Sequence, residues 1–431
     1  GLIMGRPRLT HFTLAFLGVV HGFIRVASPV NGGLCRRAAS AEVSPASERL
    51  PRRAASASMQ AGGSGPSSEE WREFRRQLIS GGIKLTTDES EPNDGGSEAV
   101  SERKVIAPGN EALLRSQNAQ LYQEYIKGSW AHESPVEAGG LLLRMPLEAQ
   151  LTHFLRDGAG TDLLGDELRQ RLRKEVSALE DGGGEERFDN WLSNTPYCYR
   201  LCEGFIAEQL EKLAAQARRG QVTVDAKSMS GSLLRLYQRA NQEWQQVVLV
   251  FSIGGGGAAS GVAINRPLMA EVTPELAKLL LKQTGEAGVL APKLIEAFGA
   301  QTCVYLGGPS DQDSGAVLVH GVHSLDGATE LAPGTGIYTG GERAAIEAVR
   351  RGAASPLDFR WFIGRHTSLK AGNGGWRGMA CARPVALKQC LGLPKPLWHE
   401  VMELCGGECA TLSRLEILKR DDLPEEDREP A

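Results

Sequence analysis

The sequence contains no apolar run long enough to cross a membrane. The apolar stretch near its N-terminus, Phe12–Val20, falls far short of the ~20 residues that a membrane-spanning helix needs. Arg6 and Arg8 precede this stretch, and we expect Met4 to be the true start. A basic segment followed by a short apolar one is typical of a secretory signal peptide. We therefore expect no membrane span in the mature protein.

The sequence also lacks the local signatures of common enzyme classes. It has no G-x-S-x-G nucleophile elbow, and Gly254–Gly257 is not followed by the Gly-Lys-Ser/Thr of a phosphate-binding loop. His399 and Glu400 begin a zinc-protease-like string, but Glu403 stands where the second histidine ligand must be. We therefore expect a hairpin loop at Gly254–Gly257 and a non-enzymatic protein. An enzyme acting on a small anionic substrate stays open as an alternative.

Cysteine never occurs as the C-x-x-C pair that is typical of redox and zinc sites. Cys198 and Cys202, like Cys405 and Cys409, are four residues apart, so each pair would face one way on a helix. Together they could bind zinc through four thiolates, whereas cysteines in a reducing compartment are more often simply buried. We expect burial, and hence neither a metal nor a cofactor.

The second cysteine pair also allows a redox reading. Gly406 and Gly407 lie between Cys405 and Cys409 and could let the backbone turn, which would bring the two sulfurs together. A thiol-based redox switch at Cys405 and Cys409 is therefore a second alternative function.

Positive charge is scarce once the N-terminal segment is set aside. Residues 1–60 hold eight Arg and two Glu, so 40 basic and 50 acidic residues remain, a charge near −10. Phosphate neutralisation dominates nucleic-acid affinity, so direct binding to nucleic acid is not expected.

The N-terminal segment has the composition of a targeting sequence. Residues 35–60 are rich in Ala, Ser and Arg, as in organelle transit peptides. A signal peptide followed by a transit peptide, together residues 1–60, predicts delivery to the stroma of a plastid. Secretion is the alternative.

Residues 61–135 are expected to form a linker with two short helices. The first helix begins near Ser67, and the second spans Glu111–Lys127. The segment between them, 83–108, is rich in acidic residues, Ser, Gly and Pro, which predicts disorder.

Short apolar strands that end at turn-forming residues recur in the remainder of the chain. Gly261–Pro267 and Val304–Pro309 are the clearest, because polar groups emerge where each buried run stops. Four more apolar runs occur in the order Gly139–Leu143, Val247–Phe251, Val317–His320 and Asp358–Gly364. A turn at Ala332–Gly341 precedes the last of them, and a helical segment at Leu397–Arg414 follows it.

In this order the segments resemble the AlgH/YqgE family, a group of bacterial proteins with plant and algal relatives that carry extra N-terminal sequence. Two features differ. Arg365–Lys370 replaces the family's Gly-Tyr-x-Gly-Trp and Gly-Gln-Leu stretch, and a long segment separates Gly139–Leu143 from Val247. A helical insertion at about 150–243 accounts for that segment. Because bacterial AlgH is described as a regulator of transcription, the resemblance implies a regulatory role.

Strands alternating with helices predict an α+β fold for a domain over 136–420. The resemblance implies a mixed, mostly antiparallel sheet curled into a pseudo-barrel with flanking helices. The helical insertion and a disordered N-terminal region add to this core, and 421–431 forms an acidic tail.

One constellation of polar and glycine residues remains as a candidate ligand site. If the strands that carry them are neighbours, as the resemblance implies, backbone N–H groups at the two glycines would lie beside an arginine, which suits an anion or carboxylate. A histidine at the end of its strand could add a proton switch. The alternative is a purely structural turn and bulge. We therefore expect a regulatory module that binds a small anionic ligand or a protein partner through Asn265, Arg266, Gly307, Gly308 and His320.

Overall fold

The computed structural model describes residues 108–420 except 158–162, 180–184, 220–223, 226, 269–270, 300, 302 and 373. Four predicted features lie outside the described residues: the targeting segment 1–60, the helix begun near Ser67, nearly all of the disordered linker, and the acidic tail 421–431.

The first sheet is antiparallel throughout. Its strand order is β1-β11-β2-β3-β4-β10. The predicted opening strand and the predicted second strand are neighbours in it, since Leu142 pairs with Val248. The six strands are β1 (Ala131–Glu133), β2 (Leu141–Arg144), β3 (Val247–Ile253), β4 (Ala259–Ala263), β10 (His366–Leu369) and β11 (Trp376–Cys381).

The second sheet is mixed, with the order β5-β9-β6-β8-β7, in which β5 and β9 run parallel. Its strands are β5 (Val304–Leu306), β6 (Ala316–His320), β7 (Ala328–Glu330), β8 (Tyr338–Gly340) and β9 (Phe359–Ile363). The chain beyond β4 runs beside β5, where Leu306 N donates to Arg266 O at 2.9 Å.

These strands confirm a mixed, mostly antiparallel α+β fold. The predicted pseudo-barrel is too strong a description, because the strands form two open sheets. Among the described residues no ladder joins the outer strands β1 and β10 to each other, and a barrel requires such closure.

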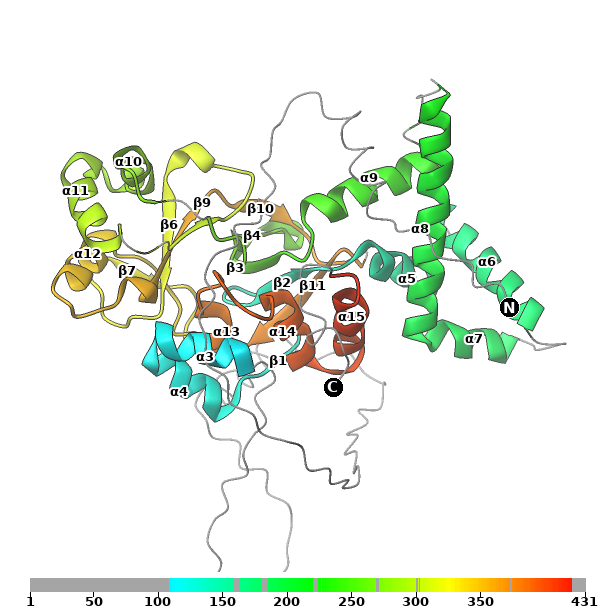
Figure 1. Ribbon diagram of the computed structural model, residues 1–431, viewed down its shortest axis with the longest axis horizontal. Coiled ribbons are helices and arrows are strands. Elements are labelled where there is room, and N and C mark those ends of the chain that lie inside the picture. The colour runs from blue at the N-terminus through cyan, green and yellow to red at the C-terminus, as the bar shows by residue number, and fades with distance from the viewer. Residues whose placement is uncertain are drawn as a thin grey trace, which may run out of the picture. The chain divides into compact units, whose positions relative to one another are not determined.

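The predicted helical insertion is present between the paired strands β2 and β3. Its helices enclose an apolar core of their own, centred on Leu151, Leu168 and Phe205. Asn194 caps the longest helix through Tyr197 N, with proline in the first turn, as the sequence predicted. In Figure 1 the helices are α5 (Leu147–Asp157), α6 (Leu163–Leu179), α7 (Glu185–Ser193), α8 (Thr195–Arg218) and α9 (Met229–Gln242).

The remaining helices cover the two sheets. One set shares an apolar core with the first sheet and contains α3 (Pro108–Gln117), α4 (Ala119–Gly128), α13 (Arg383–Leu387), α14 (Leu397–Cys405) and α15 (Gly407–Ile417). Another packs on the second sheet and contains α10 (Pro274–Leu280), α11 (Ala287–Phe298) and α12 (Glu342–Arg350).

Local signals explain several short elements. The single helix expected over Glu111–Lys127 is two helices, because Asn118 takes an extended conformation and caps α4 by accepting from Leu121 N. The glycines at 254–257 join β3 to β4, as predicted. Single turns of 3-10 helix occur at Gly255–Gly257, Lys282–Thr284, Gln312–Ser314 and Pro356–Asp358.

None of the described helices is both long and apolar enough to span a bilayer.

Candidate functional site

Asn265 follows β4 and holds the start of β3. Its Nδ2 donates to Gln245 O at 2.8 Å, and its Oδ1 accepts from Val247 N at 3.0 Å. The amide thus replaces a strand partner where the ladder ends. This side chain positions residues 244–247, and both of its polar atoms are occupied.

Arg266 lies beside a second arginine, Arg420, and both contact Trp244. Arg266 Nη2 donates to Trp244 O, and its Nη1 donates to Asn265 O at 3.3 Å. Arg420 stacks over the Trp244 ring at 4.9 Å and donates to Gln245 Oε1 at 3.0 Å. Burial, and then the charge of Arg420, lower the pKa of Arg266. Within the described part of the chain, no carboxylate pairs with Arg266.

Gly307 and Gly308 allow two strands to approach each other closely. A Cβ on Gly307 would lie 2.4 Å from Gly364 O, and one on Gly308 would lie 2.3 Å from Arg365 C. The Gly307 N–H already donates to Ile363 O at 2.7 Å. This N–H is therefore used within the sheet and is not directed at a ligand.

His320 is fully buried at the end of β6, away from the other four predicted residues. It pairs with Phe359 in the ladder, whereas Ala316, at the other end of β6, pairs with Ile363 beside Gly307. Its Nε2 lies 3.2 Å from Gly340 O, and burial lowers its pKa. The structure thus brings Asn265, Arg266, Gly307 and Gly308 into one neighbourhood and places His320 a strand length away.

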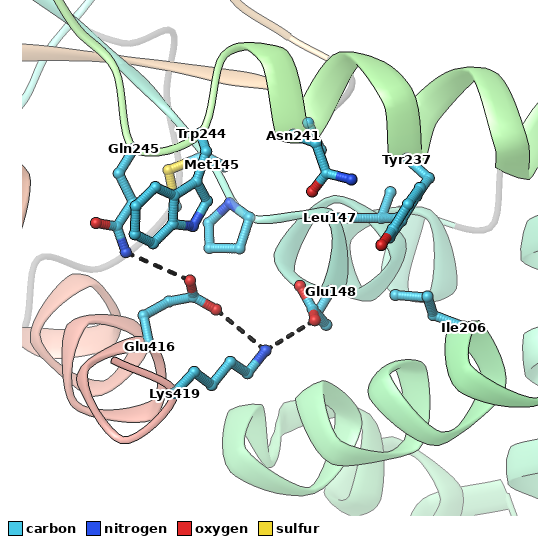
Figure 2. Close-up of a pocket in the computed structure, with 12 residues that line it drawn as sticks. Met145, Leu147, Glu148, Ile206, Tyr237, Asn241, Trp244, Gln245, Glu416 and Lys419 are labelled. Carbon is cyan, nitrogen blue, oxygen red and sulfur yellow. Dashed lines mark hydrogen bonds and ion pairs between the residues drawn. The ribbon is translucent and has the colours of Figure 1, made fainter. Parts of the chain in front are cut away.

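A pocket of about 130 Å³ opens beside Trp244 and Gln245 (Figure 2). Its apolar wall includes Trp244, Tyr237 and Ile206. Its floor carries a charged network, in which Lys419 Nζ lies 2.7 Å from Glu148 Oε1 and 3.2 Å from Glu416 Oε1. Sequence reasoning missed this pocket, because its walls come from α5, α8, α9, α15 and the segments beside them, which no local pattern connects.

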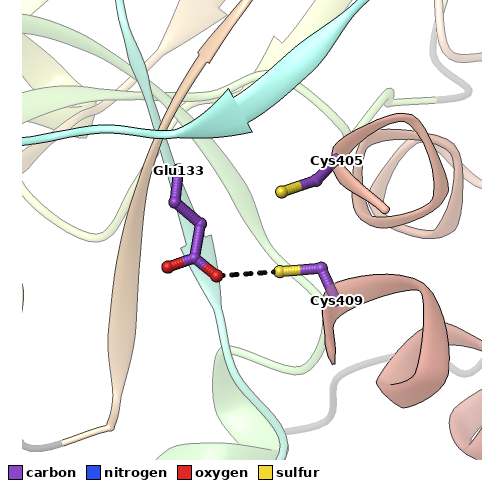
Figure 3. A group of neighbouring side chains, drawn as sticks. All are labelled: Glu133, Cys405 and Cys409. Carbon is purple, nitrogen blue, oxygen red and sulfur yellow. Dashed lines mark hydrogen bonds between the residues drawn. The ribbon is translucent and has the colours of Figure 1, made fainter. Parts of the chain in front are cut away.

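Cys405 and Cys409 form a second site with Glu133 (Figure 3). The two sulfurs and a Glu133 carboxylate oxygen all lie within 4.8 Å of one another. Cys405 ends α14, and Cys409 lies in the first turn of α15. Gly406 and Gly407, with φ of 76° and 53°, make the turn between them. The glycine turn predicted between these cysteines is therefore present.

Arg377 on β11 brings a positive charge to this cluster. Its Nη1 lies 2.9 Å from Glu133 Oε1 and 3.4 Å from Cys409 Sγ, and the Cys409 S–H donates to the same carboxylate oxygen at 3.1 Å. A hydrogen bond from Cys409 is the largest influence lowering the pKa of Cys405, and the same bond raises the pKa of Cys409.

The cluster is a poor metal site despite its three candidate ligand atoms. A divalent cation would have to sit close to the Arg377 guanidinium, which contacts two of the three ligands. Cys198 and Cys202 do not join this group in the described residues. They pack in the core of the insertion, where Cys198 donates to Trp191 O at 3.3 Å.

The zinc-protease-like string has a structural role. Glu400 is fully buried and pairs with Lys388, while His399 Nδ1 lies 3.0 Å from Ser413 Oγ. Both residues belong to the packing of α14 against its neighbours.

Comparison with known proteins finds a resemblance to one family over part of the chain. Residues 239–410 match the family model described as DUF179, AlgH-like. No curated protein matches the chain. A solved structure of a Corynebacterium diphtheriae protein is 22% identical, with coverage of 39% of this chain and 82% of that one and a TM-score of 0.27. The solution structure of the AlgH protein from Pseudomonas aeruginosa is 16% identical, covers 34% and 72%, and has a TM-score of 0.25. Over residues 239–410, the chain is therefore similar to the AlgH-like family.

Proposed function

We propose that this protein is a non-enzymatic regulatory module that binds a small anionic ligand at Arg266 and Arg420. One observation carries the proposal. Arg266 is half-buried next to a second cation, and no carboxylate among the described residues neutralises it. Placing two like charges together costs free energy, and a bound anion would offset this cost.

The chemistry of the guanidinium supports a carboxylate or phosphate. Arg266 directs donors to two backbone carbonyls, so part of its five-donor fork remains for a ligand. Trp244, 43% exposed, and the adjoining pocket offer an apolar surface to the rest of such a molecule. The small volume of the pocket favours a compact ligand over a nucleotide.

A thermal-shift screen of the full chain against small carboxylates, inorganic phosphate and nucleotides tests this proposal. A ligand at a hundredfold excess over its Kd stabilises the folded state by about 2.7 kcal/mol. We expect Arg266→Ala and Arg420→Ala to abolish the shift. Arg343→Ala is the matched control, because Arg343 pairs with Glu286 on the surface of the other sheet's helices.

Arg266→Lys separates charge from geometry. It keeps the positive charge and loses the planar fork, so we expect weaker binding than in the wild type and stronger binding than in Arg266→Ala. If no anion stabilises the wild type, or if Arg266→Ala binds equally well, the proposed site is wrong.

We also propose that residues 1–60 deliver the protein to a plastid. The support is compositional: a short apolar segment followed by an Arg-, Ala- and Ser-rich stretch. Fusing residues 1–60 to a fluorescent protein in an alga with a secondary plastid would test this proposal. Plastid fluorescence is expected, and fluorescence in the medium would instead support secretion.

A further inference from the structure

We propose that Cys405 and Cys409 are a peroxide-sensitive dithiol, in which Cys405 is oxidised first and Cys409 then closes a disulfide with it. This inference goes beyond anion binding and does not depend on it. It assigns a reversible modification site to the turn between α14 and α15.

The fold places the two sulfurs close together, on either side of one turn. They lie within 4.8 Å of each other, and a disulfide requires about 2.05 Å. Gly406 and Gly407 separate the two helices, and no atom lies within 4 Å of a Cβ built on either glycine. The turn therefore has both the backbone freedom and the open space that the remaining approach needs.

The surroundings of the two sulfurs give them different roles. Cys409 is 1% exposed, whereas Cys405 is half-buried and accessible to a small oxidant. The S–H of Cys409 can donate to Cys405 or to Glu133, and the Arg377 guanidinium lies 3.4 Å from Cys409 Sγ. The hydrogen bond from Cys409 stabilises a thiolate at the more exposed Cys405, while Cys409 keeps its proton.

The reaction consumes one peroxide per pair. The Cys405 thiolate attacks one peroxide oxygen, the O–O bond breaks, and hydroxide leaves, so Cys405 becomes a sulfenic acid. The Cys409 sulfur then attacks the Cys405 sulfur, the S–O bond breaks, and the leaving hydroxide takes the Cys409 proton to form water. Two electrons pass from the thiols to the peroxide, and an external dithiol reverses the oxidation.

Burial protects other cysteines from the same chemistry. It raises the pKa of Cys202 and Cys303 to about 12 and that of Cys390 to about 11. Thiols of this kind hold almost no thiolate at neutral pH and react slowly. Oxidation should therefore be selective for Cys405 and Cys409, at the turn between α14 and α15.

Oxidation would also break a link between α15 and the first sheet. In the reduced state, Cys409 contacts Glu133 on β1 and Arg377 on β11. A sulfur engaged in a disulfide has no S–H to donate, so the contact with Glu133 would be lost.

The test exposes the reduced full chain to a small excess of hydrogen peroxide and maps its thiols by alkylation and mass spectrometry. We expect a Cys405–Cys409 disulfide in the wild type that dithiothreitol reverses. In Cys409→Ser, a dimedone-trapped sulfenic acid should appear at Cys405. Cys405→Ser should leave Cys409 as a thiol. Cys390→Ser, the control, should oxidise like the wild type.

A second measurement does not depend on oxidation. At neutral pH, iodoacetamide should alkylate Cys405 at least tenfold faster than Cys409 in the reduced wild type. Absence of the disulfide, a sulfenic acid trapped at Cys409 in Cys405→Ser, equal alkylation rates, or stoichiometric zinc released only when both cysteines are alkylated would each overturn the proposal.

Discussion

At the scale of single residues, Lys388 and Glu400 carry two fully buried charges that contact each other. Both side chains are fully enclosed, and their ion pair is reinforced by Tyr125 and Asn110, which donate to the Glu400 carboxylate at 2.9 and 2.5 Å. Buried charges are costly to desolvate, so the stability of this region depends on every partner being present.

Removing one member of this pair should be severely destabilising. We expect Lys388→Met to lower the free energy of unfolding by about 3–5 kcal/mol, because Glu400 would be left buried without its counter-ion. Urea denaturation measures the loss. Lys212→Met, which breaks an exposed pair with Glu208, should change stability little. Equal effects in the two variants would contradict this account.

His320 makes stability depend on pH. Burial lowers its pKa in the folded state, so the unfolded chain binds the proton more tightly. Its stabilising contribution is therefore complete above about pH 6.5, the ordinary value, and is lost as the pH falls through the folded-state pKa. The titratable groups nearby are Tyr338, stacked at 5.8 Å, and His323, which meets the same Tyr338 ring edge-on.

Between about pH 7.5 and 5.5, the urea midpoint of the wild type should fall more steeply than that of His320→Phe. His366, whose pKa burial also lowers, remains in both proteins, so the difference between the two slopes isolates His320. Identical slopes would show that His320 does not titrate differently in the folded and unfolded states.

At the scale of elements, the approach of β5 to the end of β9 depends on Gly307. A methyl group there would meet Gly364 O at 2.4 Å, and backbone atoms cannot move aside as a flexible side chain would. This constraint explains the Gly-Gly-Pro sequence without invoking a ligand, although the glycines do help to place Arg266 beside the end of β5.

Gly307→Ala should destabilise the protein by about 1–3 kcal/mol, as overpacking in a filled core does. Gly255→Ala in the β3–β4 hairpin is the matched control, because no atom lies within 4 Å of its added Cβ and its φ is not positive. Thermal unfolding monitored by circular dichroism compares them. A stable Gly307→Ala protein would mean that the two strands separate easily.

At the scale of the whole molecule, α15 connects the two proposed sites. Its first turn carries Cys409, and its last turn carries Glu416, which lines the pocket beside Trp244. A change at one end of a short helix can be transmitted to the other, because the helix moves as a rigid body.

If both proposals hold, oxidation should weaken anion binding by about fivefold or more, the lower end of usual coupling energies. Titrating the anion found in the screen into reduced and oxidised protein by calorimetry measures this coupling. Cys405→Ser should bind with one affinity under both conditions. Equal affinities in the wild type would show two independent sites.

Local signals were sufficient for much of the fold. Apolar runs bounded by Gly, Pro and Asn predicted the strands at 247–251, 317–320 and 359–363, and Asn194 with Pro196 predicted the start of α8. Such signals act within a few residues, so they can be read from sequence. The resemblance to the AlgH/YqgE family, and not these local signals, indicated that β2 and β3 belong to one domain despite the intervening insertion.

The candidate sites could be predicted only in part from the sequence. The spacing of Cys405 and Cys409 and the glycine turn between them are sequence properties. The carboxylate of Glu133 and the guanidinium of Arg377 reach that turn from β1 and β11, which are far apart in the sequence, so their presence could not be predicted. His320 was correctly placed at the end of its strand, but the pairing register sets it beside Phe359 and far from Gly307.

By itself, the sequence determined the order of the elements, the helical insertion, the acidic charge and the resemblance to the AlgH-like family, because these depend on composition, periodicity and short motifs. Tertiary structure alone decided that the sheets stay open, that Arg266 and Arg420 meet at Trp244, and that a pocket forms beside this tryptophan. The physical reason is that strand register and helix packing bring together residues far apart in the chain, and no local pattern encodes these contacts.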